Sequence, residues 1–187
     1  MKNQYLEHVL VMLKQAQLKV EENFCDLTKE QLNWKPNEKT WSIAECLDHL
    51  IVTTNLYFGV FEDIKNNRLK QNIWMKLPFW KNFVTNLLLK SVDPETKKKV
   101  KTSAPFQPTK SSYSKDIVTD FSTTQAKLIT YIHELDGYDH SNIVIPSPLN
   151  AMFVYNLSDA FTILWKHQFR HFNQAMRLIQ LKDFPQQ

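Results

Sequence analysis

The sequence predicts an all-α protein, a four-helix bundle of the up-and-down type with a long crossover between its second and third long helices. Only two glycines occur among 187 residues, whereas β-structure usually needs more glycine for turns and bulges. Four long stretches carry apolar residues at alternating spacings of three and four, as in helices that bury one face in a bundle. A chain of this length is expected to fold as a single domain, residues 1–187.

The first long helix is predicted over about residues 5–24. Its apolar face contains Leu6, Val9, Leu13, Ala16, Val20 and Phe24. His8 lies off this face, so we expect it at the surface. Thr28 and Gln31 then have the spacing of a capping box, which predicts a short helical turn. We expect Trp34, just beyond it, to cover this end of the bundle.

The second long helix is predicted to begin after Ser42, which forms another capping box with Glu45. Its apolar face contains Ile43, Leu47, Leu50, Thr54, Tyr57, Phe61 and Ile64. His49 lies at the edge of this face, where a structural role is the ordinary interpretation. Cys46 is expected to be a small buried hydrophobe, although a soft metal ligand is the alternative. The capping role of Glu45 is favoured over a catalytic one.

The crossover is assigned to residues 67–110, where prolines at positions 78, 94, 105 and 108 interrupt the helical pattern. Residues 79–89 are predicted to form a short helix. Its aromatic side chains either cover one end of the bundle or touch a lipid surface, and cover is favoured. Lys97, Lys98, Lys99 and Lys101 form a basic run that we interpret as solvated, with anion or nucleic-acid binding as the alternative.

The third long helix is predicted to end at Gly137, which suits a C-terminal cap. Its apolar face contains Ile117, Phe121, Gln125, Leu128, Ile132 and Leu135. His133 and His140 are both expected at the surface. Residues 141–148 contain two prolines and are predicted to be irregular or extended.

The fourth long helix is predicted to start at an N-cap at Asn156 or Ser158 and to end before Pro185. Its apolar face contains Leu157, Ala160, Leu164, His167, His171, Ala175 and Leu178. His167 and His171 are four residues apart, so they lie one above the other where leucine is expected. Burying an imidazole without a partner costs about 1–3 kcal/mol. The pair therefore predicts a divalent metal whose third ligand comes from elsewhere in the chain.

Composition argues against several classes of protein. The formal net charge is +4, from 23 basic and 19 acidic residues, which does not by itself predict nucleic-acid binding. Two cysteines suit a reducing compartment and give no disulfide framework. No stretch reaches the roughly 18 apolar residues of a transmembrane helix, and the N-terminus lacks the apolar core of a signal peptide. We therefore expect a cytoplasmic protein with no membrane and no nucleic-acid partner.

Three imidazoles around a divalent ion leave one coordination position open for water, a substrate oxygen or a thiolate. Histidine ligands suit zinc, nickel, iron or copper, and the sequence does not choose among them. Our expectation is zinc or nickel, with iron as the alternative. Gln174 and Asp48 are candidates for orienting the imidazole rings. The pair is not HExxH, and the sequence contains no glycine-rich phosphate loop and no serine or cysteine nucleophile motif.

Three motifs, in this order, resemble the DinB-like superfamily: LNWKP at 32–36, WSIAECLDHL at 41–50 and HQFRHFNQ at 167–174. The resemblance covers nearly the whole chain. It implies a four-helix bundle with a metal held by His49, His167 and His171. It also implies that the protein can form a homodimer. It also implies a family that contains transferases and isomerases dependent on low-molecular-weight thiols such as bacillithiol, mycothiol or glutathione.

We therefore expect a metal-dependent transferase or hydrolase that activates a low-molecular-weight thiol or water for reaction with a small electrophilic substrate. Glu45, Tyr57 and Arg170 are candidate catalytic residues by their proximity in sequence alone. The alternative is a non-catalytic metal-binding or stress-response module, in which a fourth protein ligand such as Cys46 closes the coordination sphere.

Overall fold

The computed structural model describes residues 4–96, 106–148 and 150–186, and its regular structure is almost entirely helical. The long helices are α1 (Gln4–Phe24), α3 (Ile43–Lys65), α5 (Ile117–Glu134) and α6 (Leu157–Ile179). The shorter elements are α2 (Lys29–Asn33), the 3-10 helix η1 (Ile73–Lys76), α4 (Pro78–Ser91) and the strands β1 (Val144–Ser147) and β2 (Asn150–Asn156). The prediction of an all-α fold is confirmed.

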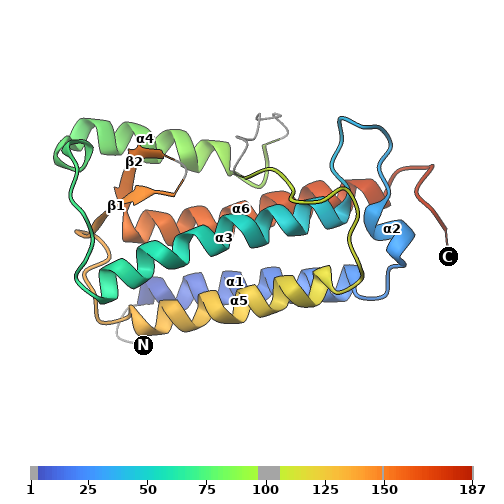
Figure 1. Ribbon diagram of the computed structural model, residues 1–187, viewed down its shortest axis with the longest axis horizontal. Coiled ribbons are helices and arrows are strands. Elements are labelled where there is room, and N and C mark those ends of the chain that lie inside the picture. Colours follow the sequence, from blue (N-terminus) through green and yellow to red (C-terminus); the bar gives the residue numbers. More distant parts are fainter. Residues whose placement is uncertain (1–3, 97–105, 149, 187) are drawn as a thin grey trace.

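The four long helices pack in a ring in the order α1, α5, α3, α6, so each contacts two others (Figure 1). One core cluster joins the first halves of α1 and α6 to the last halves of α3 and α5, and a second cluster joins the opposite ends. Helices α3 and α5 therefore run in the same direction. The up-and-down order that we predicted needs this correction, because the crossover carries the chain back to the end where α3 began.

Capping fixes where the helices of the bundle begin. Thr28 and Gln31 form the predicted box at α2, and Ser42 and Glu45 form the predicted box at α3. Asn156, not Ser158, is the N-cap of α6. The cap predicted at the end of α5 is wrong. The helix ends at Glu134, and Gly137 does not adopt the left-handed conformation that favours glycine.

The stretch 141–148, predicted to be irregular or extended, contains the extended strand β1, which forms a β-hairpin with β2. Strand β1 pairs antiparallel with β2, in the register that places Ile145 opposite Tyr155. Both of these side chains are fully buried in the first core cluster, which explains why the hairpin is held in place. The stretch 150–156 had no assignment from the sequence, because a short strand depends on a partner that periodicity does not identify.

The prediction that His140 lies at the surface is also wrong. The side chain is buried, and its Nε2 lies 2.7 Å from the carbonyl oxygen of Leu135. The loop turns inward here because Ser158 N–H donates a hydrogen bond to the His140 carbonyl at the start of α6. His8 and His133 are exposed, as predicted.

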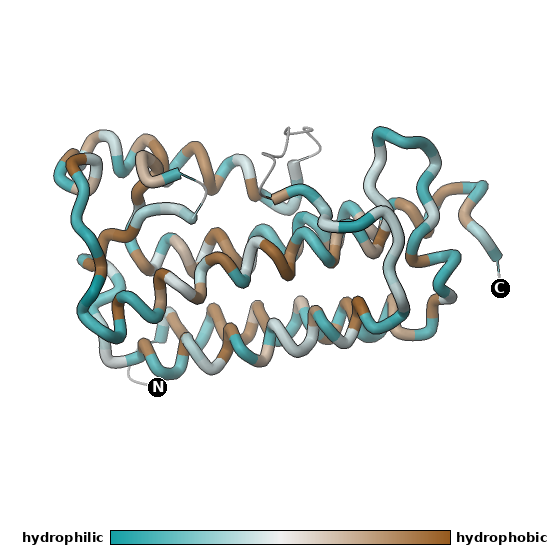
Figure 2. Tube along the Cα trace, in the orientation of Figure 1, coloured by the Kyte–Doolittle hydropathy of each residue, from teal (hydrophilic) through white to brown (hydrophobic). Residues whose placement is uncertain are grey.

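The hydrophobic positions of the four long helices alternate with polar ones along the bundle (Figure 2). At the α2 end, Trp34 packs against the second core cluster and meets Phe184 edge to face, so it covers that end as predicted. At the other end α4 lies outside the bundle, beside the hairpin (Figure 1). None of the described helices has the length and apolar character needed to span a membrane.

Helix α4 covers the bundle with only part of its surface. Val84 is buried, and Trp80 packs against the first core cluster. Phe79 and Phe83 are exposed, so the favoured interpretation of these aromatics as a cover is wrong for both. The lysine run at positions 97–101 lies outside the described residues.

Candidate metal centre

Three histidines converge between α3 and α6, at the α2 end of the bundle. His49 lies in the second turn of α3, and His167 and His171 lie one turn apart on α6. Helices α3 and α6 pack side by side. One ring nitrogen from each histidine lies within 4.8 Å of the corresponding nitrogens of the other two. The structure thus brings His167 and His171, which their spacing singled out, together with His49, which the family resemblance implied.

The spacing of these nitrogens fits a shared divalent ion. The Nε2 atoms of His49 and His167 are 3.1 Å apart. Two imidazole nitrogens each about 2.1 Å from one ion would be about 3.0–3.4 Å apart, depending on the coordination angle. The three ring centroids are 4.5–4.9 Å from one another, and the rings are steeply inclined to each other. The nitrogens can therefore approach one another without the rings overlapping.

The tautomer of His49 is fixed by the backbone. Its Nδ1 lies within hydrogen-bonding distance of the carbonyl oxygen of Phe106. A carbonyl oxygen only accepts hydrogen bonds, so Nδ1 carries the proton and Nε2 of the neutral ring presents a lone pair. That lone pair is directed to the centre of the cluster, on the side of His167. Holding a ligand histidine through its second nitrogen is the usual way in which proteins orient such rings.

His171 contributes a buried nitrogen without a hydrogen bond. Among the described residues, no donor or acceptor satisfies its Nδ1. Burial lowers the pKa of His171 and the contact with Gln174 opposes this, but no hydrogen bond satisfies Nδ1. A buried polar atom without a partner is costly, and it calls for an explanation. A bound ion would remove this cost if Nδ1 itself were the ligand atom.

Burial keeps all three imidazoles neutral near pH 7. It lowers the pKa of His49 to about 4, against weaker opposing effects of the Phe106 carbonyl and Asp48. It also lowers the pKa of His167 and of His171 well below the usual range, and the neighbouring histidines and Arg170 add to this depression. Because a metal binds the neutral imidazole, protons compete weakly with an ion at this site at neutral pH.

Trp41 covers one side of the cluster. Its ring is nearly parallel to that of His171, with centroids 5.8 Å apart, and it lies 5.0 Å from the ring of His49. His49 and His171 are buried, whereas His167 is partly exposed. Among the described residues, His167 is thus the member of the cluster that retains exposed surface. Sequence reasoning did not assign Trp41 to the site, although it stands directly before the cap of α3.

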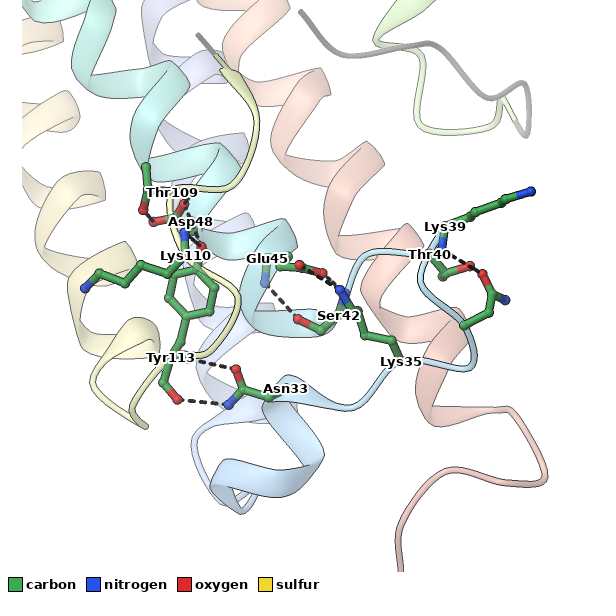
Figure 3. Close-up of polar contacts among 11 residues, drawn as sticks. Asn33, Lys35, Lys39, Thr40, Ser42, Glu45, Asp48, Thr109, Lys110 and Tyr113 are labelled. Carbon is green, nitrogen blue, oxygen red and sulfur yellow. Dashed lines mark hydrogen bonds and ion pairs between the residues drawn. The ribbon is translucent and has the colours of Figure 1, made fainter. Parts of the chain in front are cut away.

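The segment that carries Phe106 is held down by Asp48, the residue next to His49. The carboxylate of Asp48 accepts hydrogen bonds from Thr109 N–H and Oγ1 and from the Tyr113 hydroxyl (Figure 3). Asn33 exchanges two further hydrogen bonds with the backbone of Tyr113. We refer to Asp48, Thr109, Tyr113 and Asn33 as the Asp48 latch. Asp48 was considered as a group that orients an imidazole, and its carboxylate instead anchors the chain that supplies the Phe106 carbonyl.

The other candidate residues lie in different environments. Glu45 caps α3 and pairs with Lys35 at 3.0 Å, so both carboxylate oxygens have partners (Figure 3). The hydroxyl of Tyr57 lies 2.6 Å from that of Tyr155, in the core cluster at the far end of the bundle. Arg170 donates weak hydrogen bonds to the carbonyl oxygens of residues 93 and 96. Cys46 is buried, and burial raises the pKa of its thiol well above the usual range.

Within the described residues, the cluster of candidate metal-binding side chains contains the three histidines and no fourth histidine, cysteine or carboxylate. Cys46 therefore does not close the coordination sphere. The class of protein defined by these features is a helical bundle with a three-histidine cluster between two of its helices.

Comparison with known families agrees with this class. Residues 12–175 match the sequence profile of the DinB superfamily, which covers most of the chain and includes all three histidines. The chain belongs to the DinB superfamily. No curated protein and no solved structure matches the chain.

Proposed function

We propose that His49, His167 and His171 hold a divalent metal ion and that the protein is a metal-dependent enzyme acting on a small electrophilic substrate. The observation that carries this proposal is the convergence of three neutral imidazoles without a fourth protein ligand among the described residues. Three protein ligands with an open position characterise catalytic metal sites, whereas structural sites are closed by four. Zinc or nickel suits this set of ligands, with iron as an alternative.

A divalent ion at this site would act as a Lewis acid that lowers the pKa of a bound water or thiol toward neutrality. The side chains prepare the site for this chemistry. The Phe106 carbonyl keeps the lone pair of His49 Nε2 directed inward, and Trp41 shields the rings of His49 and His171 from water. Substrate would enter beside His167, the partly exposed member of the cluster.

A low-molecular-weight thiol is the nucleophile that we favour, with water as the second choice. Thiolates are strong nucleophiles, and an open metal position allows a thiol to remain ionised at neutral pH. The protein's own Cys46 cannot take this role, because it is buried and its raised pKa keeps it as the thiol. Cys25, the other cysteine, is exposed and is not part of the histidine cluster. The nucleophile would therefore be a small molecule, and the reaction a transfer of that thiol to the electrophile.

The test is a screen of the zinc- and nickel-loaded protein with glutathione, bacillithiol and mycothiol, using a chromogenic electrophile and a no-thiol reaction to detect hydrolysis. The matched control is the His167→Ala, His171→Ala variant. Turnover that depends on the metal and is lost in the variant would support the proposal. Tight metal binding without turnover of any thiol or of water would favour the alternative, a non-catalytic metal-binding or stress-response module.

A further inference from the structure

Helix α4 carries an exposed apolar ridge that the bundle does not use. Phe79, Phe83 and Leu87 follow one another at intervals of four residues, so they lie along one face of the helix. Their exposed fractions are 90%, 58% and 49%. Ile73 and Leu77, in and after η1, are also exposed, and extend the apolar surface beyond the start of the helix. We call Phe79, Phe83 and Leu87 the α4 ridge.

The opposite face of α4 is already anchored. Trp80 Nε1 donates a hydrogen bond to the Met152 carbonyl at 2.7 Å, and Lys81 Nζ donates one to Asn156 Oδ1 at 3.0 Å. Val84 is buried against the first core cluster. The helix therefore has its inner contacts in place, and the ridge is the surface that points away from the protein. Figure 1 shows α4 at the periphery of the molecule, where its outer face has no helix above it.

The charge near the ridge is mainly basic. Residues 64–92 contain six lysines and arginines and no aspartate or glutamate, although Lys65 and Arg68 are paired with carboxylates and Asp93 follows directly. Lys70, Lys76 and Lys90 are exposed, and none of them forms an ion pair with another described residue. On the inner side of α4, the carboxylate of Asp159 accepts a hydrogen bond from Thr85 and so faces away from the ridge. The outer surface is thus apolar along its centre and basic around it.

This combination suits an anionic lipid surface. A helix that lies in a membrane interface buries its apolar face among the acyl chains while its basic residues meet the anionic headgroups. A peptide helix usually docks into a groove, whereas the ridge is convex. A second copy of the chain would bring two basic surfaces together, which charge repulsion opposes. We propose that the α4 ridge binds the protein peripherally to membranes rich in anionic lipid.

This proposal revises our expectation that the protein has no membrane partner. That expectation followed from the absence of an apolar stretch long enough to span a bilayer. Peripheral binding needs no such stretch, only an exposed apolar face with cations near it. The proposal does not depend on the metal centre, because α4 lies beside the hairpin, whereas His49 lies near the start of α3 and His167 and His171 lie on the middle turns of α6.

The test is flotation of the full-length protein with vesicles of phosphatidylcholine containing 30% phosphatidylglycerol, beside vesicles of phosphatidylcholine alone. We expect binding to the anionic vesicles, at least tenfold less binding to neutral ones, and weaker binding at higher salt. The Phe79→Ala, Phe83→Ala variant should lose at least tenfold in binding, because both rings leave the interface. Leu18→Ala, which removes an exposed apolar side chain from α1, is the matched control and should bind like the unmodified protein.

Three results would overturn the proposal: no binding to anionic vesicles, equal binding by the phenylalanine variant, or equal loss in the Leu18 control. Sedimentation of the vesicle-free protein adds a further check. A dimer that the phenylalanine variant abolishes would assign the ridge to self-association instead. The His167→Ala, His171→Ala variant should float like the unmodified protein, so failure of the metal centre and failure of the ridge are distinguishable.

Discussion

The two ends of the bundle are built on different principles. At the histidine end, between the start of α3 and the end of α6, buried polar groups are held by specific partners such as the Asp48 latch and the Phe106 carbonyl. At the hairpin end the core is aromatic: Phe61 contacts Phe161 and Tyr131, and β1 and β2 close the bundle. Both ends contain an apolar core cluster, and the histidine end adds a network of directional contacts among buried polar groups.

The difference indicates which part of the bundle contributes most to its stability and which part is arranged to bind a ligand. Packing of large apolar side chains contributes most of the stability of a bundle, and it tolerates imperfect geometry better than a polar network does. Buried imidazoles contribute little to stability without a ligand, but they are positioned to bind one. Substitutions at the hairpin end should therefore have the larger effect on the free energy of unfolding, and substitutions at the histidine end the larger effect on ligand binding.

Replacement of Phe61 by alanine should have the largest effect on stability. Its side chain is fully buried among aromatic rings, so Phe61→Ala should lower the free energy of unfolding by about 3–5 kcal/mol. Urea denaturation would measure this. Phe79→Ala, which truncates an exposed ring, should change the free energy by less than about 0.5 kcal/mol. Equal costs for the two variants would contradict the contrast between a packed core and an exposed ridge.

Lowering the pH should reduce the free energy of unfolding, because the buried histidines take up protons more readily in the unfolded chain. Burial lowers the folded pKa of His49 to about 4, whereas the unfolded chain titrates near 6.5, so the unfolded state binds more protons between these values. The unfolding free energy of the metal-free protein should then rise with pH across this window, by about 3 kcal/mol for His49 alone. His167 and His171 act in the same direction.

Urea denaturation at pH 5, 6 and 7, with a chelator present, would measure this dependence. The His167→Gln, His171→Gln variant should reduce the slope and leave only the part that His49 contributes, whereas His133→Gln, which replaces an exposed histidine, should leave the slope unchanged. A variant that keeps the full slope would show that other groups cause the acid sensitivity.

Removing the Asp48 latch should have a smaller effect, on metal affinity. Asp48→Ala frees the segment that carries Phe106, so the ring of His49 loses its orientation, and affinity for zinc should fall about 10–100-fold. Competition against a chromophoric chelator would measure it. Asp120→Ala, which removes an exposed carboxylate from α5, should leave the affinity unchanged. An unchanged affinity in Asp48→Ala would mean that the latch does not position His49.

The sequence predicted the long helices well, because their information is local. Apolar spacing identified the buried faces of α1, α3, α5 and α6, and Thr28 and Ser42 marked the starts of α2 and α3 through capping boxes. The histidine pair on α6 stood out because imidazoles occupied positions where leucine was expected. The local sequence pattern is sufficient to predict a helix when the residues of that helix alone determine its boundaries and its buried face.

The remaining features depend on contacts between distant segments. The β-hairpin requires pairing of β1 with β2, and the burial of His140 requires the return of its loop to the start of α6. Phe106 lies 57 positions from His49, and no spacing rule connects them. The exposure of Phe79 and Phe83 could not be predicted either, because an amphipathic helix does not reveal which face its neighbours will cover.

The most direct test of the proposed metal centre is elemental analysis of the purified protein beside the His167→Ala, His171→Ala variant and a His133→Ala control. If the three imidazoles hold an ion, the unmodified protein and the control should each contain about one divalent metal per chain after zinc or nickel loading, and the double variant should contain almost none. Equal metal content in the folded double variant and the unmodified protein would contradict the account.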